Sequence, residues 1–184
     1  MERLPDNYYI EKVLSGSTGS FTPLLERYSR QVFTLIARIV ENREDAKELA
    51  QDTFVKAYDS LSGFRAESSF STWIYRIAYN TAISATRKKR YTYVPFDETV
   101  LSGAPDETDE IIFEVSDTET RICYLKRALK QLSPEERAMI LLFYKENKSM
   151  ENIALITGLT ETNVKTKIFR IRKKLFILIK RMEG

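Results

Sequence analysis

The sequence contains no histidine, and that absence excludes several kinds of active site at once. Ser-His and Cys-His nucleophile pairs, histidine-ligated metals and the commonest general base all require an imidazole. The single cysteine, Cys123, leaves no internal disulfide and no thiolate zinc site, and it is typical of a reducing cytoplasm. Only six glycines are present, and none forms a phosphate-binding loop. We therefore predict a protein that is not an enzyme and has neither a cofactor nor a bound metal.

Long apolar runs are also missing. No apolar run approaches the roughly 18 residues that a membrane span requires. The opening residues, MERLPDNYYIEK, lack the charged-then-apolar order of a signal peptide. The 184 residues could form one domain or two small ones, and a hydrophobic content of 43% is enough to fill a core. The sequence thus predicts a soluble, cytoplasmic protein with no membrane span.

Positive charge is absent from one stretch of the chain. Between Tyr91 and Thr120 there is no Lys or Arg, but there are nine Asp and Glu residues. Because the whole chain has a formal charge of +3, the remainder carries +12. The stretch also contains prolines and a glycine and has weak periodicity, so we interpret residues 93–118 as an acidic linker between two basic domains. This linker is either a solvated tether or an anionic strand that competes with nucleic acid for a positive channel.

Elsewhere apolar residues recur every three or four positions, which is typical of helices. The helices predicted in this way span residues 24–40, 44–61, 70–88, 119–131, 134–146, 149–157 and 161–181. Ser133 and Glu136 mark a helix start, because the serine can cap the helix and the glutamate can reach back to the serine amide. Strand-like alternation is scarce. We therefore predict an all-α fold with two small helical domains, 1–92 and 119–184, joined by the linker.

The helix predicted at 44–61 has two chemically different faces. Its buried face is expected to hold Ala46, Ala50, Phe54, Ala57 and Leu61, and the reverse carries an acidic stripe of Asp45, Glu48, Asp52 and Asp59. Such a stripe could be a plain solvated face, a divalent-metal site of a nuclease or a docking face for a basic protein. Helical carboxylate sites for metals usually combine several helices with histidine, so the docking face is favoured over the metal site.

The segment FSTWIYRIAYNTA, residues 70–82, concentrates aromatic rings beside positive charge. At 100° per residue the core face holds Ile74, Ile77, Ala78, Thr81 and Ala85, and the opposite face holds Thr72, Tyr75, Arg76, Tyr79 and Arg87. Trp73 falls at the border. Core packing explains most aromatic stripes at helical spacing. Rings and cations on the side that the core does not need indicate instead that this helix stacks on a flat, anionic partner.

The segment from Ser149 onward has the pattern of a helix-turn-helix. Ser149 and Thr160 are expected to cap its two helices, and Gly158 to form the left-handed turn between them. The second helix should bury Val164, Ile168, Ile171, Leu175 and Leu178 and should expose hydroxyls, an amide and a series of cations that includes Lys173 and Lys174. Short polar groups for base edges, followed by basic groups for phosphates, suit the DNA major groove. The alternative is a solvated basic helix at the edge of a bundle.

Taken together, these segments resemble a known family. LLERYSRQVFTLIARIV, EDAKELAQDTFVKAYDSLSGF and FSTWIYRIAYNTAISATRKKR look like region 2 of an extracytoplasmic-function (ECF) sigma factor of the sigma-70 family. LSPEERAMILLFYKENKSMENIALITGLTETNVKTKIFRIRKKL resembles its region 4. The resemblance implies a protein that binds core RNA polymerase, recognises a two-element promoter and promotes strand opening. The alternatives are a helix-turn-helix regulator that binds duplex operator DNA without polymerase, a metal-dependent nuclease and an inert helical adaptor.

The resemblance also assigns residues to three surfaces. Contacts to the beta-prime subunit of polymerase would be made by Asp45, Glu48, Leu49, Gln51, Asp52 and Val55. The minus-ten element would be opened and held by Phe64, Arg65, Ser68, Ser69, Phe70, Trp73, Tyr75, Arg76, Tyr79, Asn80 and Arg87. The minus-thirty-five element would be read by Thr160, Thr162, Asn163, Lys165, Thr166, Lys167 and Arg170.

The same resemblance implies a set of partners. They are the beta-prime and beta subunits of core RNA polymerase, promoter DNA and an anti-sigma factor, whose existence the sequence leaves open. The acidic linker would thread the polymerase channel through which nascent RNA later passes. The free protein is expected to be a monomer.

Overall fold

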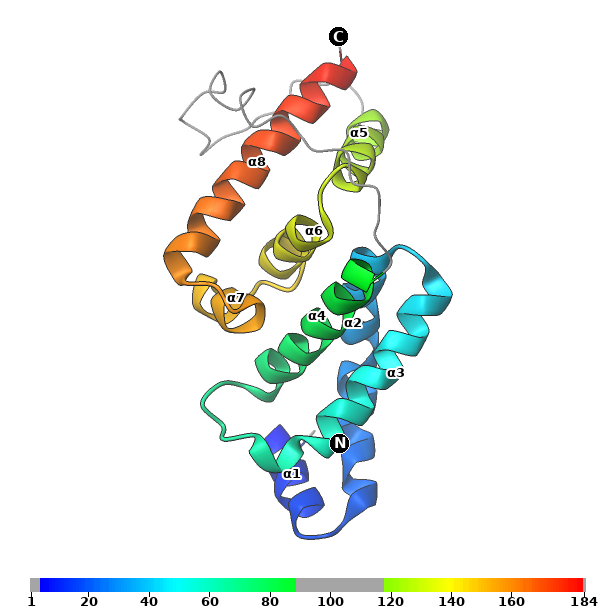
Figure 1. The fold of residues 1–184 in the computed structure, drawn as a ribbon, viewed down its shortest axis with the longest axis vertical. Helices are drawn as coiled ribbons and strands as arrows, with labels where there is room; N and C mark the ends of the chain where they lie inside the picture. Colours follow the sequence, from blue (N-terminus) through cyan, green and yellow to red (C-terminus); the bar gives the residue numbers. More distant parts are fainter. Residues whose placement is uncertain (1–3, 89–117, 184) are drawn as a thin grey trace.

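Helices are the only regular elements among the residues that the computed structural model describes, which are 4–88 and 118–183. The first part of the chain forms α1 (Asp6–Leu14), η1 (Thr18–Phe21), α2 (Thr22–Val40), α3 (Arg43–Asp59), η2 (Leu61–Gly63) and α4 (Phe70–Lys88). The second forms α5 (Thr118–Lys130), α6 (Pro134–Ile140), the π-helical turn η4 (Leu141–Lys145), α7 (Met150–Thr157) and α8 (Glu161–Glu183). Figure 1 shows two helical bundles along the long axis of the molecule. The all-α fold class with two helical domains is confirmed.

The first bundle is built around α2, which packs against both α3 and α4. Val32, Leu35 and Ile36 of α2 are fully buried, and burial of each such side chain contributes about 1.5–3 kcal/mol. α3 meets them with the predicted face, whose buried members include Ala46, Ala50, Phe54 and Ala57. The three alanines allow the helices to approach closely, and α3 turns its opposite, acidic side to solvent.

The break between α2 and α3 is made by two adjacent residues. Glu41 adopts φ 64°, which ends α2, and Asn42 then caps α3. The Asn42 Oδ1 atom accepts hydrogen bonds from the backbone N–H groups of Glu44 and Asp45, at 2.9 and 3.1 Å. The two carboxylates in this first turn also complement the positive end of the helix dipole. These contacts fix where the acidic stripe begins.

The short helix α1 was not predicted from the sequence. Its nine residues bury only Ile10, so the chain shows no clear apolar period there. α1 is held by the buried Ile10 and by polar contacts to α2, since the Asp6 carboxylate forms an ion pair with Arg27 and accepts a hydrogen bond of 2.6 Å from the Tyr28 hydroxyl. Contacts between residues more than 20 positions apart leave no periodic pattern in the sequence.

The second bundle begins at the predicted capping box. The Ser133 Oγ atom accepts from the Glu136 N–H at 3.2 Å, and the Glu136 carboxylate accepts from the Ser133 N–H at 2.7 Å. α6, η4, α7 and α8 then enclose a core that includes Leu142, Ile153, Ile156 and Val164, all fully buried. α5 packs on the far end of α8 through Ala128, Leu178 and Ile179. The predicted acidic linker, 93–118, lies outside the described residues except for Thr118, where α5 begins.

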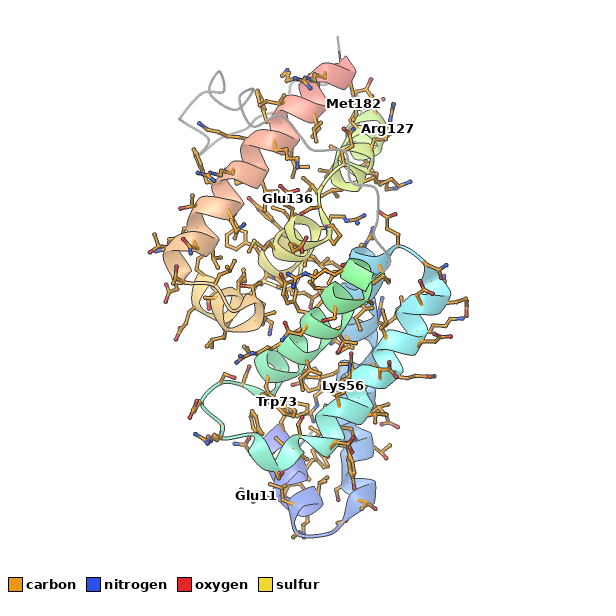
Figure 2. All side chains as sticks on the ribbon, in the orientation of Figure 1. Glu11, Lys56, Trp73, Arg127, Glu136 and Met182 are labelled. Carbon is orange, nitrogen blue, oxygen red and sulfur yellow. The ribbon has the colours of Figure 1, made fainter. Side chains whose placement is uncertain are left out.

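The two bundles pack directly against each other. α4 lies against α7, and α2 lies against α6, so one continuous hydrophobic cluster includes residues of both domains. Figure 1 shows α4 between the other helices of the first bundle and the helix-turn-helix. Figure 2 shows the side chains that extend from both bundles toward the space between them. This packing decides which parts of α4 reach solvent.

Candidate polymerase and nucleic-acid interfaces

The acidic face of α3 lies on the outside of the first bundle. Glu48, Gln51 and Asp52 are exposed, Asp45 and Leu49 are half-buried, and the apolar side chain of Val55 is 60% exposed. α3 packs mainly against α2, α4 and η2, all of which belong to its own domain. The structure therefore brings all six predicted polymerase contacts onto one helix, around an exposed apolar residue.

An aromatic cluster occupies the junction between the 64–69 loop and α4. The ring of Phe64 lies 5.3 Å from that of Trp73 and 5.8 Å from that of Phe70, and the Phe70 and Trp73 rings are 5.5 Å apart. Ser69 caps α4, because its Oγ accepts from the Thr72 N–H at 3.2 Å. Trp73 and Phe64 are half-buried and Arg65 is exposed, whereas Phe70 is 2% exposed and serves as the floor of the cluster. Trp73 is labelled near this end of α4 in Figure 2.

Three side chains predicted on the solvent face of α4 are buried instead. Thr72, Tyr75 and Tyr79 are 1%, 2% and 7% exposed, so the predicted exposure of these residues is wrong in this structure. The physical reason is the second domain, which covers this side of α4, whereas a helical wheel drawn from α4 alone contains only one core. Burial is also the main reason that the pKa of the Tyr79 hydroxyl rises to about 12, and the nearby Glu135 raises it further.

A second stripe of α4 does remain open. Arg76, Asn80 and Arg87 are exposed, at the spacing that places them along one side of a helix. Ser68 is half-buried and Ser69 exposed in the loop that leads into α4. The predicted minus-ten residues therefore divide into an accessible set, with two arginines from α4 and one from the loop, and a covered set of Phe70, Tyr75 and Tyr79.

The helix-turn-helix forms as predicted. The Ser149 Oγ accepts from the Asn152 N–H at 3.1 Å, Gly158 adopts φ 74°, and the Thr160 Oγ1 accepts from the Asn163 N–H at 3.2 Å. Val164, Ile168 and Ile171 are buried. All the predicted minus-thirty-five residues are exposed, namely Thr160, Thr162, Asn163, Lys165, Thr166, Lys167 and Arg170. The first three turns of α8 thus present a polar and basic face.

The basic face of α8 ends earlier than the sequence indicated. Lys173 and Lys174 are 9% and 5% exposed, so their predicted place on the solvent face is wrong. α8 continues past its exposed first turns and packs against α6 and α5. There the Lys174 ammonium binds the Glu136 carboxylate, with N–O distances of 2.9 and 3.1 Å, and the Lys173 ammonium lies 4.6 Å from the centre of the Phe169 ring.

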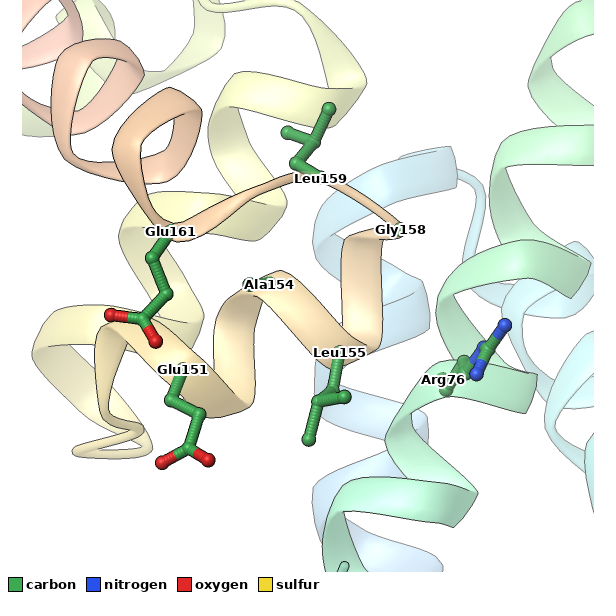
Figure 3. Close-up of a pocket in the computed structure, with 7 residues that line it drawn as sticks. All are labelled: Arg76, Glu151, Ala154, Leu155, Gly158, Leu159 and Glu161. Carbon is green, nitrogen blue, oxygen red and sulfur yellow. The ribbon is translucent and has the colours of Figure 1, made fainter.

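An open cleft separates part of α4 from the helix-turn-helix. It has a volume of about 350 Å³, and its lining includes Arg76 of α4, Glu151 and Leu155 of α7, and Glu161 at the start of α8. In Figure 3 Arg76 stands on α4 across from α7, with Glu151 and Glu161 on the other domain. The first turn of the helix predicted to read duplex DNA therefore lies at the same cleft as a residue predicted to hold the opened strand.

Residues 4–88 and 118–183 show neither a metal-binding group of side chains nor a membrane-spanning helix. Within these ranges no three Cys, Asp or Glu side chains are grouped closely enough to hold a metal ion. The same part of the chain contains no helix with the length and apolar character needed to cross a membrane.

Comparison with known proteins identifies the class to which this arrangement belongs. The family model of sigma-70 region 2 matches residues 24–92, and that of sigma-70 region 4 matches residues 124–175. The ECF RNA polymerase sigma-E factor of Escherichia coli K12 is 30% identical over 178 residues, which cover 94% of this chain and 93% of that protein. The ECF RNA polymerase sigma factor SigW of Bacillus subtilis is 28% identical over 178 residues, covering 90% and 92%.

Solved structures show the same fold. CnrH, in complex with the cytosolic domain of CnrY, has a TM-score of 0.68 at 22% identity, covering 96% of this chain and 97% of its own. The sigma factor RpoE of Bartonella quintana, in complex with the anti-sigma factor NepR, has a TM-score of 0.62 at 24% identity, covering 87% and 96%. The helices thus define a two-domain protein of the sigma-70 type. The chain belongs to the ECF sigma factors, and its function is that of an RNA polymerase sigma factor. The alternative of a regulator that works without polymerase is not favoured.

Proposed function

We propose that this sigma factor docks on core RNA polymerase through the acidic face of α3. The carboxylates of Glu48 and Asp52 are exposed, and Val55 offers an apolar centre between charged neighbours. Complementary charge of this kind steers a basic partner surface toward the helix and repels nucleic acid from it. The proposed contact set is Asp45, Glu48, Leu49, Gln51, Asp52 and Val55, on the beta-prime subunit.

The opened minus-ten strand is held, in this proposal, by the 64–69 loop and the exposed stripe of α4. Trp73 supplies a half-exposed ring at the edge of the aromatic cluster, and stacking of a base on such a ring contributes about 1–3 kcal/mol. Arg65, Arg76 and Arg87 are exposed cations suited to phosphates, and Asn80 offers an amide to a base edge. Phe70 acts from below by supporting Trp73.

The minus-thirty-five element is read, in the same proposal, by the start of α8. Hydroxyl and amide side chains come first, at Thr160, Thr162, Asn163 and Thr166, and basic side chains flank and follow them. Short polar groups near the N-terminal end of a recognition helix reach base edges, and longer basic groups reach the phosphates on either side.

The remaining roles follow from the chemistry of initiation. The polymerase forms the phosphodiester bonds, and this chain catalyses no reaction and requires no cofactor. It acts in the cytoplasm and is a monomer when free, with functional domains at 1–92 and 119–184 and the acidic linker in the RNA channel. Because RpoE was solved with an anti-sigma factor and CnrH with the cytosolic domain of CnrY, we include an anti-sigma factor among the proposed partners.

One observation supports the proposal most directly: a single chain exposes an acidic helix face in one domain and a hydroxyl-rich, basic helix face in the other. A run-off transcription assay with purified core polymerase and a library of promoter sequences tests it. We expect transcripts only when the protein, the polymerase and a two-element promoter are all present. The protein alone should bind promoter duplex poorly, and tight binding without polymerase would contradict the proposal.

The docking face can be tested separately by charge reversal. Asp45→Lys combined with Asp52→Lys should lower the affinity for core polymerase by at least about 100-fold, because two attractive contacts become repulsive. Glu11→Lys, an exposed reversal on α1, is the matched control and should bind like the unmodified protein. Competition with a labelled sigma factor for core polymerase measures both affinities. Retention of full affinity by the double variant would rule out α3 as the docking face.

A further inference from the structure

The side chain of Tyr28 on α2 connects α1 to the aromatic cluster at the start of α4. Its hydroxyl donates a hydrogen bond of 2.6 Å to the Asp6 carboxylate of α1. Its ring lies 5.5 Å from the ring of Phe70, at an interplanar angle of 56°. Aromatic pairs prefer such distances and tilted arrangements. Because the Phe70 ring lies 5.5 Å from that of Trp73, an unbroken series of contacts leads from Asp6 to Trp73.

The Asp6 carboxylate is itself held in place by several contacts. It forms an ion pair with Arg27, and the two side chains are 20% and 21% exposed. The Arg27 guanidinium also donates to the Leu4 carbonyl at 2.8 Å and lies 5.8 Å from the centre of the Tyr9 ring. Burial and the hydrogen bond to Asp6 raise the pKa of the Tyr28 hydroxyl, so that this hydroxyl remains a donor. α1 thus places a fixed acceptor beside Tyr28.

α1 also contacts the segment that carries Phe64, the second ring beside Trp73. It packs against η2, which ends at Gly63, directly before Phe64. Leu61 of η2 is 1% exposed and belongs to the same hydrophobic cluster as Ile10 of α1. The Phe64 ring lies 5.3 Å from that of Trp73. One short helix therefore supports both rings that pack on Trp73, one through Tyr28 and the other through η2.

The first turns of α4 are held independently of Tyr28. The Lys148 ammonium donates to the Ser71 hydroxyl at 2.7 Å, and the Tyr75 hydroxyl donates to the Glu146 carboxylate at 2.6 Å. Both contacts come from the second domain, on another side of the helix. Loss of the Tyr28 ring should therefore loosen the aromatic cluster and leave the helix itself in place.

We infer that Tyr28 is a positioning residue for strand opening, and that α1 holds it so that Trp73 keeps the open face of its ring toward an incoming base. This inference deepens the proposed function and rests on it, because it takes Trp73 as the ring on which the base stacks. Neither Asp6 nor Tyr28 needs to touch DNA. They act by preorganisation, which lowers the cost of ordering the site when a base binds. α1 precedes residue 24, at which the match to sigma-70 region 2 begins.

The fluorescence of the free, full-length protein tests the contact directly, because Trp73 is the only tryptophan in the chain. Time-resolved anisotropy shows whether its ring moves with the domain or separately from it. We expect only slow tumbling for the unmodified protein. Tyr28→Leu should add a component on the nanosecond timescale or faster, as for a side chain that changes rotamer freely. Tyr144→Leu, which removes an exposed tyrosine of the second domain, is the control and should leave the decay unchanged.

Two further variants separate the ring from the group that holds it. Tyr28→Phe keeps the ring and loses only the hydrogen bond to Asp6, and Asp6→Ala keeps Tyr28 whole but removes the acceptor. Both should add a smaller fast component than Tyr28→Leu does. Since neither variant removes a ring, both still test the role of α1 if Tyr28→Leu loses native helix content.

A double-mutant cycle tests whether Tyr28 acts through Trp73. Stopped-flow fluorescence of a labelled promoter gives the rate of open-complex formation with core polymerase. Tyr28→Leu should slow this rate by about 2- to 10-fold, as expected for the loss of one aromatic pair, and should leave the affinity for core polymerase unchanged. In a Trp73→Ala background the same change should alter the rate by less than about 2-fold. A purely structural role would slow opening by the same factor in both backgrounds.

Either of two results would overturn the inference. One is an anisotropy decay that is the same in Tyr28→Leu, Asp6→Ala and the unmodified protein. The other is a cycle in which the effects of Tyr28→Leu and Trp73→Ala on the rate simply multiply. Failure of the proposed function looks different, because Trp73→Ala alone would then open promoters at the unmodified rate, while the fluorescence of the free protein would still report the contact.

Discussion

The Trp73 side chain is packed against other aromatic rings and is still partly open to solvent. Its ring packs against Phe64 and Phe70 at 5.3 and 5.5 Å, yet it is only half-buried. A ring held on one side by other rings loses little freedom when a base stacks on its open side. Such a site favours an unpaired base over a paired one, because only the unpaired base can leave its own stack.

Trp73→Ala should therefore slow open-complex formation by about 10-fold or more, which corresponds to the loss of one stacked base. Affinity for core polymerase should stay nearly unchanged, because Trp73 lies on α4 and the docking face lies on α3. Trp73→Phe keeps a ring and should restore most of the rate. Stopped-flow fluorescence of a labelled promoter measures the rate, and equal losses of rate and polymerase affinity in Trp73→Ala would refute the separation of roles.

The burial of Tyr75 and Tyr79 could not be predicted from the sequence pattern of α4 alone. The helical wheel placed both opposite the core of the first bundle. The second domain then covers that side of α4, and Tyr75 is left 2% exposed. Exposure depends on contacts between residues about 70 positions apart, which hydrophobic periodicity does not record. Arg76 and Asn80 were placed correctly because the cleft leaves their stripe of α4 open.

At the scale of an element, α6 depends on one side chain with two partners. Glu136, labelled in Figure 2, accepts from the Ser133 N–H at the start of its own helix and binds the Lys174 ammonium of α8. Lys174 is buried, so its charge relies on this carboxylate more than a surface lysine would. The cap of one helix and the docking of another are thus coupled through a single group.

Glu136→Gln should lower the free energy of unfolding by about 1–3 kcal/mol, because the amide can still cap α6 but cannot neutralise the buried ammonium. Glu151→Gln, an exposed change on α7, is the control and should stay within about 0.5 kcal/mol of the unmodified protein. Urea unfolding followed by circular dichroism gives both values. If the two variants proved equally stable, Glu136 and Lys174 would contribute nothing as a pair.

Helices α2 to α8 were predictable because their signals are local. The caps at Ser133, Ser149 and Thr160, the turn at Gly158 and the small buried residues of α3 each act within a few positions of the chain. α1 and the burial of Lys173 and Lys174 were missed, because they depend on contacts made by distant elements. The same division separates the start of α8, whose exposure was predicted correctly, from the covered part of α4.

At the scale of the whole molecule, three tyrosines lie at the contacts that hold the helices of both domains together. Burial raises the pKa values of Tyr28, Tyr75 and Tyr79, and the Asp6 and Glu146 carboxylates raise those of Tyr28 and Tyr75 further. Below pH 10 these hydroxyls are protonated in both the folded and the unfolded chain. Above pH 10 the unfolded chain loses the protons first, so the folded state loses stability as the pH rises.

For Tyr79, whose pKa is about 12, this loss should reach about 1.3 kcal/mol at pH 11. Tyr79→Phe should therefore flatten the fall in the urea midpoint between pH 9 and pH 11. Glu135 and Arg87, which act on this hydroxyl in opposite directions, are unchanged in that variant. Burial lowers the pKa of Lys148, so this group makes the fold more stable as the pH rises toward 10.5. The two proteins are therefore compared with each other at each pH. An identical pH profile for both proteins would contradict the prediction.

The contact between the two domains depends on the length of the π-helical turn at Leu141–Lys145. Because the turn contains one residue more than a regular helix would use, it sets the rotational phase of everything that follows it. Deletion of Tyr144 or Lys145, which are exposed, would keep every buried core side chain yet rotate Glu146 and Lys148 by about 100° around the helix axis. The stability of the contact between the two domains thus depends on the length of this turn as well as on the side chains in it. Insertions or deletions in the turn would change that stability.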